Sequence, residues 1–223
     1  MQNHPIGSRI PVATDAAIFT IHNGTFCVLL IQMKKNPFKD QWALPGGLLE
    51  TTETSKTAAL RILKDQTGIT DAFLEQLGTF DDPKRDPLGR VVSIAYVALV
   101  PHESILLHTT SKYADVRWWP VDELPKLAYD HAEITRMAVE RIRAKIGYAN
   151  IAWSLLPAAF PLSALRNTYE IILGRSLDKR NFIKKVLLQT GLLEPTGEKG
   201  SGAHRPAKLY RFKQRKPSYV DIL

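Results

Sequence analysis

The chain has 223 residues, of which 44% are hydrophobic and 9% aromatic, so it can fold around one large core or two smaller ones and is not low-complexity disorder. Its net charge of +8 is unevenly placed. Residues 1–150 hold 17 Lys and Arg against 17 Asp and Glu, whereas residues 151–223 hold 13 against 5. This asymmetry predicts a neutral module followed by a basic one, and a basic module most often binds nucleic acid.

The sequence shows neither a membrane-spanning segment nor a secretion signal. Apolar runs such as residues 26–33 fall far short of the roughly 20 residues that a span requires. The N-terminus lacks the charged and then apolar pattern of a signal peptide. We therefore expect a cytoplasmic protein with no membrane partner. The single cysteine, Cys27, lies in an apolar run, which favours a buried thiol over a reactive one.

The first 150 residues contain strand-like runs, loops and two helices. We expect strands at residues 15–20, 25–33, 73–80, 91–100 and 115–119. Asn23-Gly24 is typical of a hairpin turn between the first two strands. The unbroken apolar run 91–100 indicates a central strand buried on both faces. Two prolines and a glycine make residues 81–90 a loop. This order of elements predicts a mixed sheet covered by helices.

A helix over residues 130–146 should close the first module. Asp130 and Glu133 have the spacing of a capping box, and Gly147 is a candidate C-terminal stop. Apolar residues recur along one side of this helix and charged residues along the other. We therefore expect it to pack on the sheet and to lead into the next module.

The stretch from Gly46 to Ile69 organises the first module, because a Gly-Gly loop is followed by a helix of about four turns. It can be compared with the pattern G-x5-E-x7-R-E-U-x-E-E-x-G-U, in which U is aliphatic. The positions that match are Gly47, Glu53, Arg61, Leu63, Gly68 and Ile69. The stretch therefore resembles a Nudix box, and the resemblance implies a Nudix fold.

The acidic positions of this helix depart from the Nudix pattern. In a Nudix hydrolase they hold divalent cations against a diphosphate, because hard cations prefer carboxylate oxygens. The three positions that carry glutamate in the pattern are Ile62, Asp65 and Gln66 here, so one carboxylate of three remains. We therefore expect the pocket to remain while most of the metal site is lost. On this interpretation the protein is not an enzyme, has no metal ligands and requires no cofactor.

The candidate ligand-binding residues are of four kinds. They are glycines whose backbone can approach a ligand, a tryptophan for stacking, arginines for phosphate, and carboxylates for ribose hydroxyls or a weak cation. They are Trp42, Gly46, Gly47, Glu50, Glu53, Arg61 and Arg85. Arg61 is equally suited to bracing a neighbouring carboxylate. We interpret His131 as an ordinary first-turn helix residue, and no serine or cysteine nucleophile is indicated.

After residue 149 the pattern changes to short helices and a hairpin. We expect helices at 151–156, 163–173 and 178–190 and strands at 192–195 and 208–212. The connection Gly174-Arg175-Ser176-Leu177 is typical of a helix-turn-helix, with Asp178 capping the third helix. The strands flank a glycine-rich basic hairpin. Together these patterns predict a winged helix-turn-helix.

Candidate DNA-binding residues lie on the third helix and in the wing. In a helix-turn-helix the recognition helix enters the major groove, and basic side chains on it and on the wing contact phosphates and bases. The candidates are Lys179, Arg180, Asn181, Lys184, Lys185, His204, Arg205 and Lys208. The alternative is a solvated basic surface, but here the charge coincides with a helix-turn-helix pattern.

Further motifs extend the resemblance over the whole chain. They include DPxRDPxGRVVS at residues 82–93, VxWWP at 116–120, LGRxLDKRNF at 173–182 and RPAKLYR at 205–211. The chain is similar to the Nudix-related transcriptional regulators, NrtR. The resemblance implies a sensor over residues 1–147, a winged helix-turn-helix over 148–223, and dimeric binding to palindromic operators of bacterial NAD metabolism genes. It also implies release from DNA by ADP-ribose or a related NAD metabolite.

Met33 departs from the resemblance, because relatives often have an arginine at this point, and ligand contacts there are open. Two alternatives to a repressor remain. One is a Mg²⁺-dependent ADP-ribose pyrophosphatase with an accessory basic domain, using Glu50, Glu53 and Asp65. The other is a nucleic-acid-binding adaptor with an empty Nudix scaffold.

Overall fold

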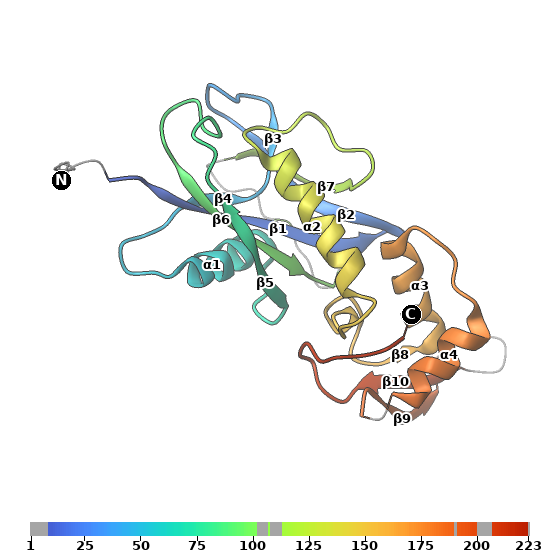
Figure 1. The fold of residues 1–223 in the computed structure, drawn as a ribbon. Coiled ribbons are helices and arrows are strands. Elements are labelled where there is room, and N and C mark those ends of the chain that lie inside the picture. The colour runs from blue at the N-terminus through green and yellow to red at the C-terminus, as the bar shows by residue number, and fades with distance from the viewer. Residues whose placement is uncertain (1–8, 102–106, 108–112, 190, 200–206, 223) are drawn as a thin grey trace.

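The computed structural model describes residues 9–101, 107, 113–189, 191–199 and 207–222 (Figure 1). Within these ranges no helix combines the length and apolar character that crossing a bilayer requires. The elements in chain order are β1 (Val12–His22), β2 (Thr25–Met33), β3 (Trp42–Ala43), β4 (Gly46–Leu48), α1 (Ser55–Thr67), β5 (Phe73–Phe80), β6 (Val92–Leu99), β7 (Tyr113–Pro120), α2 (His131–Lys145), η2 (Ala152–Ser154, a 3-10 turn), β8 (Phe160–Pro161), α3 (Leu162–Leu173), α4 (Lys179–Leu188), β9 (Leu193–Lys199) and β10 (Lys208–Phe212).

The first part is a mixed sheet of seven strands. Its main path runs β3-β2-β1-β6-β5, with β4 also paired to β1 and β7 to β2. The pairing of β1 with β6 is parallel, and the other pairings are antiparallel. This confirms the expected mixed sheet. One detail was wrong: Gly46 and Gly47 lie in β4 rather than in a loop, because their backbones pair with Asp15 and Thr14 of β1.

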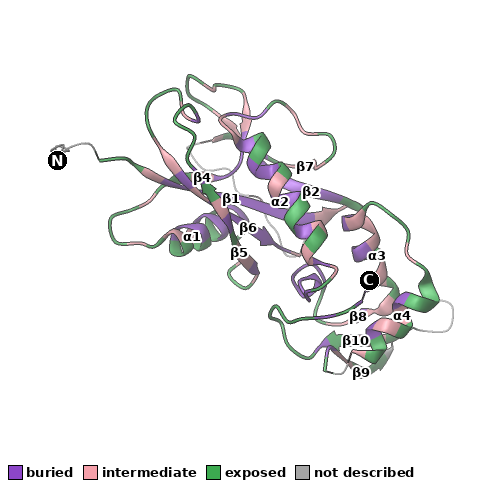
Figure 2. Cartoon of the chain, viewed as in Figure 1, coloured by how far each residue is buried: buried purple, intermediate pink, exposed green. Residues whose placement is uncertain are grey.

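Successive side chains of β1 and β6 point to opposite faces of the sheet, and both faces are buried. Ala17 and Phe19 point into the core that includes α2, whereas Ala16 and Ile18 point into the core that includes α1. Helices thus cover both faces, which explains why the central strands β1 and β6 are buried over most of their length (Figures 1 and 2). The β1–β2 hairpin turns at Asn23, as expected, with φ of 49° there and 75° at the following glycine.

Helix α1 begins and ends with local signals that the sequence carries. The hydroxyl of Thr54 accepts a hydrogen bond from the Thr57 N–H at 3.2 Å. At the other end Gly68 adopts the left-handed conformation, with φ of 74°. Its inner face, including Ile62 and Leu63, packs against the sheet.

The capping box predicted at the start of α2 is not formed. Asp130 is the N-cap residue, but its side chain makes no capping hydrogen bond. Both of its carboxylate oxygens instead accept hydrogen bonds from Arg85. The local spacing of Asp130 and Glu133 could not reveal this competitor, because Arg85 lies 45 residues earlier in the chain.

The second part is a winged helix-turn-helix, as expected. Helix α3 packs against the antiparallel sheet β8-β10-β9 and against α4, and the carboxylate of Asp178 caps α4 by accepting from the Asn181 N–H at 2.7 Å. Three details differ from the prediction. Residues 151–156 contain only the short turn η2, α4 ends at Leu188, and β8 is an additional strand.

The two parts share one continuous core. The hydroxyl of Ser154 is fully buried; it accepts a hydrogen bond from the Phe73 N–H at 2.7 Å and donates one to the Leu99 carbonyl at 2.6 Å. This contact joins η2 to the edge of the large sheet. Near the C-terminus, residues 218–220 pair with residues 148–150 through two backbone hydrogen bonds. Ser154 therefore ties the second part to the large sheet, and the C-terminal segment of the second part returns to its own beginning at residues 148–150.

Candidate functional site

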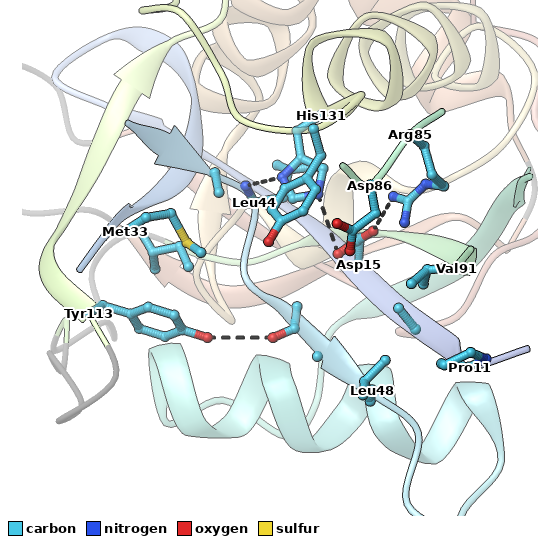
Figure 3. Close-up of a pocket in the computed structure, with 16 residues that line it drawn as sticks. Pro11, Asp15, Met33, Leu44, Leu48, Arg85, Asp86, Val91, Tyr113 and His131 are labelled. Carbon is cyan, nitrogen blue, oxygen red and sulfur yellow. Dashed lines mark hydrogen bonds and ion pairs between the residues drawn. The ribbon is translucent and has the colours of Figure 1, made fainter. Parts of the chain in front are cut away.

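A cavity of about 280 Å³ opens beside the start of α2. Its wall combines the β1–β4 pair, the end of β2, the loop after β5, the start of β7 and the turn before α2 (Figure 3). The lining residues are Pro11, Ala13, Asp15, Ile31, Met33, Ala43, Leu44, Gly46, Gly47, Leu48, Arg85, Asp86, Val91, Tyr113, Tyr129 and His131. Its volume is close to the lower end of the roughly 300–1,000 Å³ of small-molecule sites.

A buried carboxylate, Asp15, lies at the polar end of this cavity. One of its oxygens accepts hydrogen bonds from the Ser93 hydroxyl at 2.6 Å and from Arg85 Nη2 at 3.1 Å. The other oxygen lies 3.5 Å from Nε2 of His131. Burial alone would raise the pKa of Asp15, but His131, Ser93 and Arg85 outweigh burial and hold the pKa below its usual value. Asp15 is therefore a buried anion.

His131 links this carboxylate to the backbone that shapes the cavity. Its Nδ1 accepts a hydrogen bond from the Leu44 N–H at 2.9 Å. The neutral ring consequently carries its proton on Nε2, the nitrogen that faces Asp15 (Figure 3). The side chain is only 4% exposed. His131 is thus a fixed part of the cavity wall, which the interpretation as an ordinary first-turn residue missed.

Arg85 joins the cavity to the start of α2. It donates Nε to one oxygen of Asp130 at 2.9 Å and Nη2 to the other at 2.8 Å, while Nη2 also contacts Asp15. This fork-to-carboxylate geometry is the strong form of the ion pair. The guanidinium, predicted to bind phosphate, is thus shared between two carboxylates, so this group of three side chains carries a net charge of −1.

Gly46 is required by the close approach of Asp15. A Cβ atom on Gly46 would lie 2.2 Å from Oδ1 of Asp15 and 3.0 Å from the Thr14 carbonyl oxygen. A Cβ on the neighbouring Gly47 would meet no heavy atom within 4 Å. Only the first glycine of the pair is therefore fixed by packing in this structure.

Two tyrosines supply an aromatic wall. The Tyr113 hydroxyl donates to the Gly46 carbonyl at 3.4 Å. Tyr129 packs against Phe38 and His131, with ring centroids 4.3 Å and 5.1 Å apart. Burial raises the pKa of both tyrosines, so both phenols remain protonated donors at neutral pH.

The structure brings three of the seven predicted ligand residues to this cavity: Gly46, Gly47 and Arg85. Trp42 is not among its lining residues. Its ring packs edge-on against Trp119 with centroids 5.2 Å apart, and the Arg117 guanidinium lies 5.7 Å from its centre. The place of Trp42 in β3 therefore favours a packing role over stacking with a ligand.

The remaining three predicted residues form their own cluster, with Arg61 on α1 and both glutamates in the segment before it. Arg61 donates two hydrogen bonds to the Glu53 carboxylate, at 2.6 Å and 3.1 Å, and lies 4.0 Å from Glu50. Arg61 holds the pKa of Glu53 below its usual value. Of the two roles considered for Arg61, this geometry matches the bracing of a carboxylate.

The helix positions that carry glutamate in the Nudix pattern differ in exposure. Ile62 and Gln66 are buried, whereas Asp65 is exposed. The Gln66 side-chain oxygen is buried without a hydrogen-bond partner. Across the described residues, no three His, Cys, Asp or Glu side chains are grouped so that they could hold a metal ion.

The exposed face of α4 is strongly basic. Phe182 and Val186 are buried and fix the helix against α3, where Phe182 meets Tyr169 edge-on at 5.2 Å. Leu187 is 52% exposed, because one residue beyond Val186 the helix has turned by about 100°. The exposed predicted DNA contacts on α4 are Lys179, Arg180, Asn181 and Lys184.

Other predicted contacts differ in accessibility. Lys185 is only partly exposed, and Lys208 is exposed at the start of β10. His204 and Arg205 lie outside the described residues, so their predicted contacts stay predictions. The structure thus places five of the eight candidates on accessible surface, four on one helix and one on the wing.

Comparisons with known proteins match both parts of the chain. A model of the NUDIX domain matches residues 11–138, and a model of the NrtR DNA-binding winged helix domain matches residues 152–212. The chain is 36% identical over 208 residues to the ADPR responsive transcriptional repressor NtrR of Acinetobacter baylyi, covering 90% of this chain and 81% of that protein. The chain belongs to the NrtR family.

Solved structures of NrtR proteins agree with this assignment. Shewanella oneidensis NrtR in complex with a 27mer DNA is 33% identical, with a TM-score of 0.81, and the match covers 91% of this chain and 93% of that one. The NUDIX domain of the same protein in complex with ADP ribose is 32% identical, with a TM-score of 0.55 over 63% of this chain and 94% of that one. An NrtR fold thus accounts for both the pocket and the basic helix.

Proposed function

We propose that this chain is a bacterial transcriptional repressor that binds operator DNA of NAD metabolism genes as a homodimer and is released by ADP-ribose or a related metabolite. One observation carries the proposal: the same chain contains a Nudix domain with a cavity and an NrtR winged helix domain. The similarity to an ADPR responsive repressor supports both halves. Such a protein acts where the bacterial chromosome is, in the cytoplasm.

The cavity chemistry supports a nucleotide effector. Tyr113 and Tyr129 offer aromatic surface and protonated hydroxyls, and the Gly46-Gly47 backbone leaves room for close approach. Arg85 is the cation at the polar end, and Asp15 offers an acceptor for sugar hydroxyls. Apolar side chains, Met33 and Leu48 among them, complete the wall. These groups suit a ligand with a base, a ribose and a diphosphate.

Efficient hydrolysis is not part of the proposal. Ile62 has no ligand atom, Gln66 is neutral and buried, and Glu53 already accepts two hydrogen bonds from Arg61. Such donors do not fit the divalent cations that a Nudix hydrolase uses. The same residues weaken the pyrophosphatase alternative, which needs Glu50, Glu53 and Asp65 to share a metal.

The basic face of α4 supports operator binding. Arg180 and Lys184 are exposed one helical turn apart, and Asn181 lies beside them as a candidate base reader. Two copies of this helix related by a twofold axis would reach two half-sites about one DNA turn apart. We therefore assign the homodimer to the DNA-bound form.

A gel-shift experiment tests this function. The purified chain is mixed with its own promoter DNA, with and without ADP-ribose and Mg²⁺, while release of AMP is measured. We expect sequence-selective binding that ADP-ribose relieves without release of AMP. Steady release of AMP without a selective shift would favour the hydrolase. Selective binding without any ADP-ribose effect on DNA affinity or thermal stability would favour the adaptor.

A further inference from the structure

Asp130 occupies the N-cap position of α2, but its side chain makes no capping hydrogen bond. It directly precedes α2, where an aspartate normally accepts a hydrogen bond from a first-turn N–H. Here both carboxylate oxygens are bonded to Arg85, and the side chain is 15% exposed. The first turn of α2 is therefore without its side-chain cap while Arg85 holds Asp130.

The residue before Asp130 holds a strained backbone conformation. Tyr129 has φ of 54°, in the left-handed region that side chains other than glycine rarely adopt. It also lines the cavity, as does Arg85. A ligand in this cavity therefore touches both sides of Asp130: the residue before it in the chain and the cation that holds its side chain.

The far end of α2 reaches the DNA-binding part. Arg143 donates a hydrogen bond from Nε to the Ile172 carbonyl of α3 at 3.0 Å. Ile142 and Ile146 are fully buried in the core that also contains Leu165 and Tyr169 of α3. Helix α2 thus runs from the cavity to α3, and α3 in turn packs against α4.

We propose that Asp130 is the residue that couples the effector pocket to DNA binding. This inference rests on the proposed function. With the pocket empty, Asp130 pairs with Arg85. When the diphosphate of the effector takes the Arg85 guanidinium, Asp130 turns to cap α2, the turn at Tyr129 relaxes, and α2 shifts against α3. The two arrangements are mutually exclusive, because one carboxylate cannot satisfy both partners in full.

The contacts explain why Asp130 moves and Asp15 stays. Asp15 keeps Ser93 and His131 as donors when Arg85 turns to a phosphate. Asp130 has no hydrogen-bond donor to its side chain except Arg85 within the described structure, but the N–H groups of the first turn of α2 lie next to it. Loss of Arg85 therefore leaves only Asp130 in need of a new partner.

The test is the variant Asp130→Asn, which keeps a capping oxygen but loses the charge that holds Arg85. ADP-ribose affinity is measured by calorimetry, and affinity for the promoter duplex selected by the wild-type chain is measured by fluorescence anisotropy. We expect ADP-ribose to bind more tightly and the duplex more weakly, each by on the order of fivefold, because coupling between two sites is reciprocal. Merely structural damage would weaken both affinities.

Two further variants sharpen the test. Asp130→Ala can neither pair nor cap, so its ADP-ribose affinity should be lower than that of Asp130→Asn. Glu140→Gln removes an equal charge from the exposed side of α2, where it pairs with Arg136, and should change neither affinity. The coupling is refuted if Asp130→Asn has the same two affinities as the wild type, or if it binds both ADP-ribose and the duplex more weakly. A wild-type chain that ADP-ribose does not release from DNA refutes the proposed function, and the coupling with it.

Discussion

Replacing Gly46 with alanine should destabilise the protein through a single contact. The added methyl carbon would lie 2.2 Å from Oδ1 of Asp15, whereas real Cβ contacts are essentially never below 3.0 Å. The carboxylate or strand β4 must therefore move by about 0.8 Å, the difference between these two distances. The neighbouring Thr14 carbonyl, at 3.0 Å, leaves the methyl group little freedom in another direction.

The expected loss of stability in Gly46→Ala follows from the hydrogen bonds that Asp15 accepts. Overpacking of a filled core costs about 1–3 kcal/mol. Asp15 is 5% exposed and accepts charge-assisted hydrogen bonds, so displacing it also weakens these, and the upper part of the range applies. In a protein of this length about 2–3 kcal/mol corresponds to a fall in Tm of roughly 4–12 °C.

Thermal and urea denaturation measure this change, and Gly47→Ala is the matched control. Gly47 is on the same short strand, but a Cβ there meets no heavy atom within 4 Å. We expect its stability to stay within about 0.5 kcal/mol of the wild type. Equal stability of the Gly46→Ala and Gly47→Ala variants would refute the packing argument.

Three more predictions concern DNA binding, the shared core and pH. Arg180→Ala should weaken duplex binding and reduce the salt slope by about 1, whereas Arg136→Ala on the sensor should not; equal slopes in both variants would remove α4 from the interface. Ser154→Ala should lower the free energy of unfolding by about 1–3 kcal/mol, because two buried backbone groups lose a partner, whereas exposed Ser163→Ala should have almost no effect in urea titration. Because the pKa of Asp15 is lowered on folding, its contribution to stability is fully present above the ordinary aspartate pKa of 3.8 and is lost as the pH falls from there through the lower pKa of the folded state. The stability gap between the wild type and Asp15→Asn should therefore shrink below that pH, and a constant gap would contradict this.

Local patterns in the sequence predicted most of the elements. Runs of strand-forming and apolar residues, with turn residues such as Asn23, predicted the long strands, and the connection that begins at Gly174 predicted the helix-turn-helix. These signals are local, since they depend on neighbouring residues. Strands β3 and β8, of two residues each, have no periodicity to detect. They exist only because a longer strand offers them hydrogen bonds.

The pocket was harder to predict, because its residues meet across the fold. Asp15 and Arg85 are 70 residues apart and His131 follows 46 residues after Arg85, so no local pattern relates the three. The phosphate role predicted for Arg85 treated it as a loop cation and did not anticipate the two carboxylates. One signal was available in the sequence. Asp15 lies inside the apolar strand β1, and a buried carboxylate needs a cation or hydrogen-bond donors beside it.

The burial of residues 151–156 limits where this protein can be divided to build chimeric regulators. All six side chains are buried, and the Ser154 hydroxyl bonds the sheet of the first part. A graft that begins at residue 148 would carry an apolar stretch away from the surface that covers it. A junction at residues 157–159, where the chain emerges into solvent, would leave that stretch in place. The terminal segment 218–222 should then be kept together with the connector at 148–150, because swapping one without the other would break the two backbone hydrogen bonds that join them.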